Sequence, residues 1–433
     1  MKKFFSTFLL ACIILSLFSA CAKPQVPDIE ESESELDFHG GKVVVYMDLY
    51  NKLFKPVAGA TAADDRMNQR LYDIQNKYNL VFAEEETDNP ALTFMTGSLT
   101  GNFTADIVID GPAELYEIYK IDSLIPTEEI IENPKDNKYG TPKLIEAAIF
   151  HGKQYGVLPY LHDTPPDIAG LLSLKMDSVK EFNLNDPHEI IEAGEWDWEH
   201  FRQYLTEATF SDGDIDYAGM VLSGSRNSCN SFAPFILSNG GSMIKYSEAG
   251  GYQVAFNSPE AIEAMEYISS VFSSPYADCP AVDEKKYIIT LGSPSFKATE
   301  DEIHVLRVPY GPKGSPDTIS SIFYDFNFWA YPIFTIYAAN ELSAITNDLF
   351  EPLSDIYPNG WKDYVMDNYF YDTQDYEYYC IAADNALYID NDLFGNTFFP
   401  LLQRINSGTD SVQASIESLT DLVQSRLDEK YNH

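Results

Sequence analysis

Residues 42–47 carry the sequence KVVVYM, a continuous run of mostly apolar side chains close to the start of the chain. Such a run is typical of a strand that is buried on both faces, as the strands of a parallel sheet are. A segment with helical periodicity follows at 64–78, and two further apolar runs follow at 80–83 and 105–110. Buried strands that alternate with helices predict an α/β fold with a parallel sheet and crossover helices.

Acidic and aromatic side chains stand at the ends of these predicted strands. Asp48 comes directly after the first strand between Tyr46 and Tyr50, and Asp110 ends the third strand. Ligands of open α/β sheets bind beyond the carboxyl ends of the strands. An acid is costly there unless it is paired or solvated. We therefore expect these four side chains to contribute to a ligand site, although a tyrosine in a strand more often packs in the core.

The composition restricts the class of protein. The 433 residues include 28 Lys and Arg against 67 Asp and Glu, which gives a formal charge of −39. This balance excludes a nucleic-acid binder, because phosphate recognition depends on clusters of cations. Apolar residues make up 45% and aromatic residues 14% of the chain, which is ample for a packed core. The length exceeds what one core usually serves, so we expect two domains.

The N-terminus has the pattern of a secretory signal. Lys2 and Lys3 precede an apolar run at 4–18, which is too short to span a bilayer as a helix. Residues 17–21, LFSAC, resemble the lipobox of bacterial lipoproteins, although Phe18 departs from its preferred residues. This resemblance implies a signal peptide at 1–20 and lipidation of Cys21, with ordinary secretion as the alternative. The Pro-, Ser- and acid-rich residues that follow predict a flexible tether at 21–40.

Six further segments, in the same order along the chain, resemble family 1 extracellular solute-binding proteins, the sugar-type receptors of ABC importers. These segments are KQYGVLPY at 153–160, EWDWEHF at 195–201, SDGDIDYAG at 211–219, FNSPEAIEAMEY at 256–267, VPYGPKG at 308–314 and INSGTDSVQA at 405–414. Each motif is weak by itself, but their order and their position behind a lipobox make the combined signal specific. One departure is LGSPSF at 291–296, where the family often has a glycine followed by tryptophan.

The resemblance implies a two-lobed, type II periplasmic-binding-protein-like fold, in which each lobe is a mostly parallel sheet flanked by helices. It implies that 41–165 and about 325–350 form the first lobe, and that about 166–324 and 351–433 form the second. The ligand would lie in the cleft between the lobes. The protein would be a monomer, anchored outside the cytoplasm by its lipid, that closes over a carbohydrate and delivers it to ABC permease subunits.

A sugar site needs aromatic faces and a few polar groups that are placed to meet hydroxyls. Tyr160, His162 and Asp163 flank the expected first crossing between the lobes, and Asp325 and Trp329 belong to the second. A further candidate from the second lobe, which could replace the family's tryptophan, is Phe296. Core packing is the competing explanation for each aromatic candidate.

Other functions remain open at this stage. A secreted carbohydrate-active enzyme, a hydrolase or lyase using Asp or Glu, is the main alternative to a binding protein, and a chemosensory co-receptor is another. The seven histidines have no HxxxH or HExxH spacing, so we expect no metal and no cofactor. After the signal, Cys229, Cys279 and Cys380 remain, which permits at most one disulfide.

Overall fold

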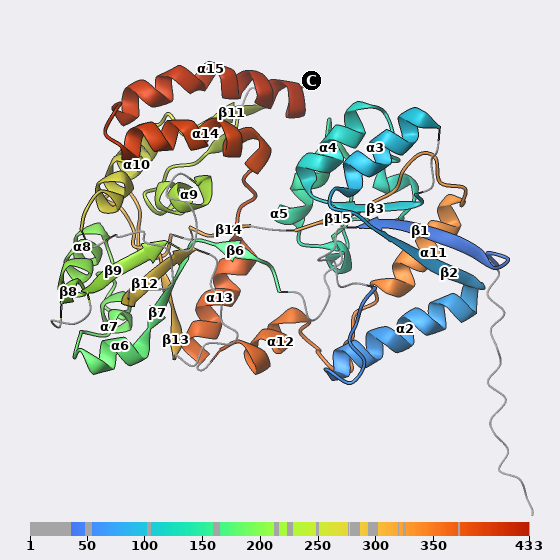
Figure 1. The fold of residues 1–433 in the computed structure, drawn as a ribbon, viewed down its shortest axis with the longest axis horizontal. Helices are drawn as coiled ribbons and strands as arrows, with labels where there is room; N and C mark the ends of the chain where they lie inside the picture. The colour runs from blue at the N-terminus through green and yellow to red at the C-terminus, as the bar shows by residue number, and fades with distance from the viewer. Residues whose placement is uncertain are drawn as a thin grey trace, which may run out of the picture.

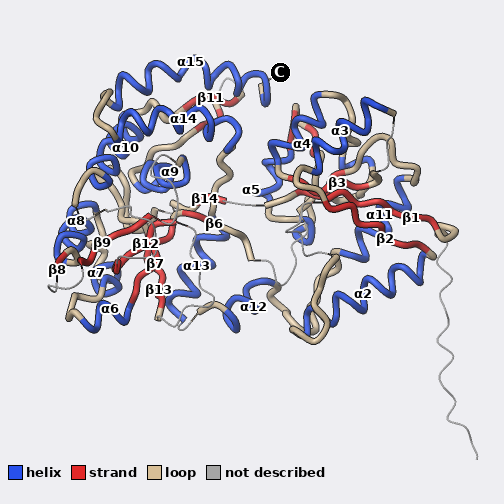
Figure 2. The backbone as a smooth tube through the Cα atoms, in the orientation of Figure 1, coloured by secondary structure: helices blue, strands red, loops and turns tan. Residues whose placement is uncertain are grey.

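Two groups of strands, each surrounded by helices, make up the described part of the chain (Figures 1 and 2). The computed structural model describes the following residues: 36–47, 54–101, 105–158, 165–211, 216–222, 228–247, 251–275, 277, 286–292, 302–318, 320–323, 326–370 and 373–432. Within these residues, none of the helices combines the length and the apolar character that crossing a membrane requires.

The sheet of the first lobe is mostly parallel, as the sequence predicts. Its central strand β1 (Gly41–Met47) lies between β2 (Leu80–Glu86) and β3 (Ile107–Asp110), and both pairings are parallel. The fourth strand, β15 (Phe328–Ala330), returns from the distant C-terminal half of the chain and pairs antiparallel with β3. The apolar run at 42–47 therefore forms the predicted strand, and it is central in its sheet.

Helices cover both faces of this sheet, and each face has its own core. Alternate residues of β1, which include Val43 and Val45, pack into one core, whereas Tyr46 packs against the other. The helix predicted at 64–78 begins slightly earlier, because the Thr61 side chain accepts a hydrogen bond from Asp64 N and caps it.

The helices of this lobe are α2 (Ala62–Tyr78), α3 (Pro90–Thr100), α4 (Pro112–Lys120), α5 (Pro142–Ile145) and α11 (Ala339–Leu349). Short 3-10 helices lie at Thr127–Glu129, Asn137–Tyr139 and Glu146–Ala148, and a small hairpin pairs β4 (Ile149–Phe150) with β5 (Lys153–Gln154).

The sheet of the second lobe is mixed, which differs from the mostly parallel sheet that we expect for each lobe. Its order is β13 (Ile303–Arg307), β7 (Leu171–Lys175), β12 (Lys286–Gly292), β9 (Asp216–Leu222) and β8 (Phe210–Ser211). Only β12 and β9 pair in parallel, and the other three pairings are antiparallel. The reason lies in β7, which enters from the first crossing and runs between β13 and β12. These two neighbours share one direction and β7 runs the opposite way, so both of its pairings are antiparallel.

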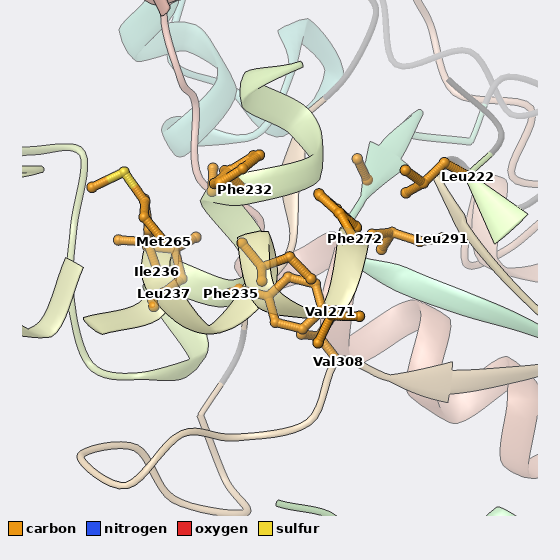
Figure 3. Packing of buried hydrophobic residues seen from close by; sticks show 14 of the residues in the cluster. Leu222, Phe232, Phe235, Ile236, Leu237, Met265, Val271, Phe272, Leu291 and Val308 are labelled. Atoms are coloured by element: carbon orange, nitrogen blue, oxygen red, sulfur yellow. The ribbon is translucent and has the colours of Figure 1, made fainter. Parts of the chain in front are cut away.

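The second lobe has a large apolar core, part of which Figure 3 shows, and a smaller one to which β7, β13 and α13 (Thr373–Asn385) contribute. Phe232 and Phe235 from α9 and Phe272 from α10 lie within the large core, as Figure 3 shows. Trp196 and Trp198 are also buried there, so they pack this lobe. The helices of this lobe are α6 (Met176–Glu181), α7 (Pro187–Glu192), α8 (Trp198–Glu207), α9 (Cys229–Ser238), α10 (Pro259–Phe272), α14 (Asn391–Asn406) and α15 (Val412–Tyr431). A small hairpin pairs β10 (Ile244–Tyr246) with β11 (Tyr252–Val254).

The described segments on either side indicate three passages of the chain between the lobes. The first two crossings run side by side, because β6 (Ile168–Ala169) pairs antiparallel with β14 (Ile322–Phe323). The third includes α12 (Trp361–Asn368) and leads to α13 (Thr373–Asn385), which packs against β13. Before this crossing, Asp355 forms an ion pair with Arg66 of α2, so the segment after α11 stays on the first lobe.

Two of the three cysteines that follow the predicted signal lie in the described residues. Cys229 and Cys380 are both buried and free. Burial raises the pKa of the Cys229 thiol to about 12, so this thiol stays protonated at neutral pH. Cys279 lies outside the described residues.

Candidate functional site

The carboxyl ends of the strands in the two lobes lie near the same crossing. In the first sheet β1, β2 and β3 are parallel, so their ends at Met47, Glu86 and Asp110 share one edge. Phe328, the first residue of β15, pairs with Asp110 at this edge. Phe323, the last residue of β14, is only five positions earlier in the chain, a span of at most about 18 Å.

The second sheet meets the same crossing from the other side. Phe323 pairs with Ile168 of β6, which lies three residues before the start of β7 at Leu171. Leu171 in turn pairs with Gly292, the carboxyl end of β12. The carboxyl end of the parallel pair β9 and β12 therefore adjoins the crossing, as does the carboxyl edge of the first sheet. We define these two edges together as the candidate site.

Asp110 lies at this edge, where its carboxylate also has a structural role. Its Oδ2 accepts a hydrogen bond from Ala91 N at 2.8 Å, and its Oδ1 accepts one from Gly111 N at 2.8 Å. Ala91 belongs to the first turn of α3, so the negative charge also stabilises the positive end of that helix. Asp110 is half-buried, so part of the residue is accessible to a molecule that approaches from solvent.

The two aromatic candidates in the described residues have different surroundings. Tyr46 is half-buried and packs against the core that includes Val108. Trp329 is fully buried, with its ring centroid 5.9 Å from that of Phe54 and 5.2 Å from that of Phe350. A ring in this position has no face open to a ligand in this structure, and it stabilises the first lobe from within.

The other predicted site residues cannot be placed in this way. Asp48, Tyr50, Tyr160, His162, Asp163, Phe296 and Asp325, together with the predicted lipidation site Cys21, lie outside the described residues. Their contribution to a site stays a prediction.

Two polar side chains lie beside Asp110: Glu114, which the sequence did not single out, and Asn327, which the sequence offers as a candidate in the second crossing together with Asp325 and Trp329. A Cβ atom added to Gly111 would be 2.6 Å from Glu114 Oε2 and 3.9 Å from Asn327 Oδ1, which shows how closely both side chains approach this turn. Glu114 is in the first turn of α4, which begins at Pro112 after the N-cap Gly111 that follows β3. The position of Glu114, four residues after Asp110, was the sequence signal that could have identified Glu114 as a residue of the candidate site.

The rest of this edge is also acidic. Glu84 and Glu86 belong to β2, and Glu86 forms an ion pair with Lys55. Burial raises the pKa of Glu84, and the nearby charge of Glu86 raises it further while Lys55 lowers it. With Asp110 and Glu114, these residues supply many oxygen acceptors, which suits hydroxyl groups or a cationic solute.

The lobes also touch at a second place, at the far end of α15. Tyr116 of α4 donates a hydrogen bond from its hydroxyl to the carbonyl of Glu429 at 3.3 Å. The neighbouring Lys430 is almost fully buried, and its ammonium lies 2.8 Å from Asp390 Oδ2. Burial raises the pKa of Tyr116 to about 12, so its hydroxyl remains a donor at neutral pH.

Among the described residues, one buried group could hold a metal ion. It consists of His188, His304 and Asp375, and it lies inside the second lobe, away from the candidate site. Motif spacing could not identify it, because the three residues come from distant parts of the chain.

Comparison with known proteins gives matches at the level of structure only. No family model and no curated protein sequence matches the chain. The ABC substrate-binding protein Lmo0181 from Listeria monocytogenes, in complex with cycloalternan, superposes with a TM-score of 0.62 at 12% identity, covering 90% of this chain and 99% of its own. The cyclic alpha-maltosyl-1,6-maltose binding protein from Arthrobacter globiformis gives a TM-score of 0.62 at 16% identity, with the same two coverages of 90% and 99%.

The chain has the two-lobed periplasmic-binding fold. The prediction of this fold from the sequence is thereby confirmed. Within this fold, the facing carboxyl edges are the place where a ligand is expected, which is where Asp110 and Glu114 lie. The fold alone does not define the ligand, since UgpB from Mycobacterium tuberculosis, in complex with glycerophosphocholine, superposes equally well, with a TM-score of 0.61 at 13% identity and coverages of 90% and 99%.

Proposed function

We propose that this chain is a lipid-anchored, extracytoplasmic solute-binding protein of the family 1 type, which captures a carbohydrate and delivers it to the permease of an ABC importer. It binds its solute without chemical turnover. The observation that carries this proposal is the arrangement of the two carboxyl edges around one short crossing between β14 and β15. An arrangement of this kind lets one small molecule touch both lobes at once.

Binding works by closure of the lobes. A ligand that contacts both edges stabilises the closed form over the open form by its extra contacts in the closed form. Asp110 and Glu114 provide acceptors for hydroxyl groups from the first lobe, and Tyr46 provides part of an aromatic surface. We expect a Kd of about micromolar, which corresponds to roughly −8 kcal/mol.

We propose the division of lobes expected from the sequence, with one adjustment. The first lobe holds 41–165 and about 325–355, and the second lobe holds about 166–324 and the residues after the third crossing. The third crossing follows Asp355 rather than residue 351, because Asp355 and Glu351 pair with Arg66 and Lys138 of the first lobe.

The N-terminal segment anchors the protein. Signal cleavage before Cys21 and acylation of this cysteine would leave an acidic tether that holds the lobes away from the membrane. Cells that express the full chain should incorporate labelled palmitate into it, and Cys21→Ala should abolish the label and move the protein into the soluble extracytoplasmic fraction. If the unchanged protein takes up no label, it is an ordinary secreted protein.

The function is tested with the purified protein and a panel of oligosaccharides, sugar alcohols and amino sugars. A ligand at 100 times its Kd should raise stability by about 2.7 kcal/mol, which a thermal-shift assay detects readily. Mass spectrometry of the denatured protein should find the same class of compound retained from the host. The absence of any shift across the panel at millimolar ligand would contradict the carbohydrate assignment.

Two further measurements separate the alternatives. New reducing ends released from polysaccharide would identify a carbohydrate-active enzyme and overturn the binding function. Recovery of the permease subunits with the cross-linked protein supports import, whereas recovery of a sensor protein would identify a co-receptor.

A further inference from the structure

Two histidines and an aspartate meet inside the second lobe. His188 comes from α7, His304 from β13 and Asp375 from the first turn of α13. The two histidines are each 7% exposed and Asp375 is fully buried. One nitrogen or oxygen atom from each of the three residues lies within 4.8 Å of the other two. We propose that this group binds a divalent first-row transition metal ion, with Zn²⁺ as the best fit.

The outer nitrogen of each histidine is held by a carboxylate. His188 Nδ1 lies 2.8 Å from Asp186 Oδ1, and His304 Nε2 lies 3.0 Å from Glu302 Oε1. A carboxylate oxygen only accepts hydrogen bonds, so both of these nitrogens carry protons. Ligand histidines in metal sites characteristically have this partner, which fixes the ring and makes the opposite nitrogen a better ligand.

The inner nitrogens therefore face acceptor oxygens: His304 Nδ1 faces Asp375, and His188 Nε2 lies 3.2 Å from the carbonyl oxygen of Val305 as well as near Asp375. His304 Nδ1 lies 3.0 Å from Asp375 Oδ2, and His188 Nε2 lies 3.7 Å from Asp375 Oδ1. In a neutral imidazole with its outer nitrogen protonated, the inner nitrogen has a lone pair, and a lone pair repels a carboxylate. Positive charge is therefore needed between the inner nitrogens and the carboxylate of Asp375. Either a proton on each imidazole ring supplies this charge, or one metal ion shared by the two rings and the carboxylate does.

Spacing and charge fit a metal ion. Zn²⁺ binds nitrogen and oxygen at about 2.0–2.2 Å, so tetrahedral ligand atoms are separated by about 3.3 Å. The separations of 3.0 Å to Asp375 Oδ2 and 3.7 Å to Asp375 Oδ1 lie on either side of this value, and one atom from each of the three residues lies within 4.8 Å of the other two. With Asp186 and Glu302, the group contains three carboxylates, and Lys180 lies 2.7 Å from Glu302 Oε2.

The site would fasten α13 to the second sheet. Asp375 Oδ1 already accepts a hydrogen bond from Val305 N of β13 at 2.8 Å. A metal ion held by the same carboxylate would add a link from α13 to both β13 and α7. Because α13 directly follows the third crossing, this link would fix the point at which that crossing joins the second lobe.

Metal content tests the proposal directly. The purified full-length protein, freed of metal by chelator and then incubated with Zn²⁺ or Co²⁺, should retain one equivalent of ion after gel filtration. Its Tm should rise by at least about 2 °C. His304→Gln and Asp375→Asn should lose the retained ion. The control His39→Gln, which changes an exposed histidine paired with Asp37, should retain it.

A second pair of variants keeps the test valid if loss of a ligand unfolds the lobe. Asp186→Asn and Glu302→Gln leave all three ligands in place and should weaken metal affinity about 10–100-fold. Retention of less than about 0.2 equivalents by the unchanged protein at micromolar Zn²⁺, or equal affinity in Asp186→Asn, would overturn the proposal and leave protonated histidines as the cations of this group.

Discussion

The ammonium of Lys430, on α15 of the second lobe, lies 4.8 Å from the centre of the Tyr116 ring on α4 of the first lobe. The same ammonium lies 2.8 Å from Asp390 Oδ2, and the Tyr431 hydroxyl donates a hydrogen bond to that oxygen at 2.6 Å. Lys430 and Asp390 are 2% and 1% exposed, so the pair is shielded from water. The buried ion pair of Lys430 and Asp390 in the second lobe therefore lies against an aromatic face of the first lobe.

Replacing Tyr116 with leucine should weaken the contact between the lobes. The leucine removes a desolvated cation–π contact of about 2 kcal/mol and a hydrogen bond of about 1 kcal/mol. We expect a lower denaturation midpoint and a larger radius of gyration in X-ray scattering from the ligand-free protein. Tyr116→Phe is the matched control, because it keeps the ring and loses only the hydrogen bond to Glu429. If both variants behave alike, the cation–π contact contributes nothing.

The two roles of Asp110 can be separated by two substitutions. Asp110→Ala removes the acceptors for Ala91 N and Gly111 N and should cost about 1–2 kcal/mol of unfolding free energy. Asp110→Asn keeps an acceptor oxygen and should cost less. If the carboxylate also contacts the solute, Asp110→Asn should weaken binding at least tenfold by calorimetry while the midpoint changes little. Unchanged affinity in this variant would assign Asp110 to the support of α3 alone.

Trp329 should affect stability and not binding. Trp329→Phe leaves a cavity among Phe54 and Phe350, and we expect a loss of about 1–3 kcal/mol in chemical denaturation. The folded fraction should bind solute with an affinity within about twofold of the unchanged protein, because the buried ring is not at the surface. A tenfold loss of affinity without loss of stability would contradict this position and restore Trp329 as a ligand platform.

Asp197 should make the stability of the second lobe depend on pH in the acidic range. It caps α8 by accepting hydrogen bonds from Glu199 N at 3.0 Å and His200 N at 2.9 Å. Burial raises the pKa of Asp197, but the hydrogen bonds and the charge of His200 outweigh this effect, so the folded pKa is lowered. Because the folded pKa is lowered, the charged carboxylate of Asp197 stabilises the fold at any pH above its unfolded pKa of about 3.9. This contribution is lost as the pH falls through the lower pKa of the folded state.

The matching experiment compares the unchanged protein with Asp197→Asn. Asparagine caps a helix equally well, so the difference reflects the charge at the helix N-terminus, about 0.5 kcal/mol. The difference in unfolding free energy should be constant from about pH 7 to pH 5 and should shrink as the pH falls below the unfolded pKa of about 3.9 toward the lower folded pKa. Glu199→Gln serves as a control at the neighbouring position. A difference that persists undiminished near pH 3 would contradict the assigned pKa direction.

Local sequence was sufficient for much of the secondary structure. The run at 42–47 forms β1, and the Ser258-Pro259 pair begins α10, with the Ser258 side chain accepting a hydrogen bond from Ala261 N. Helix caps and apolar periodicity depend on residues within one or two turns, so they are visible in the sequence. The two-lobed fold was predictable because several such local patterns occur in a characteristic order.

Tertiary structure alone decided the direction of the strands around β7, the burial of Trp329 and the association of His188, His304 and Asp375. Trp329 follows a strand pattern that fits both a core residue and a ligand platform, and only the packing of Phe54 and Phe350 around it distinguishes the two. The histidine–aspartate group is formed by α7, β13 and α13, which are remote in the chain. Contacts of this kind depend on how distant elements share one core, and a pattern with a period of two or 3.6 residues carries no information about them.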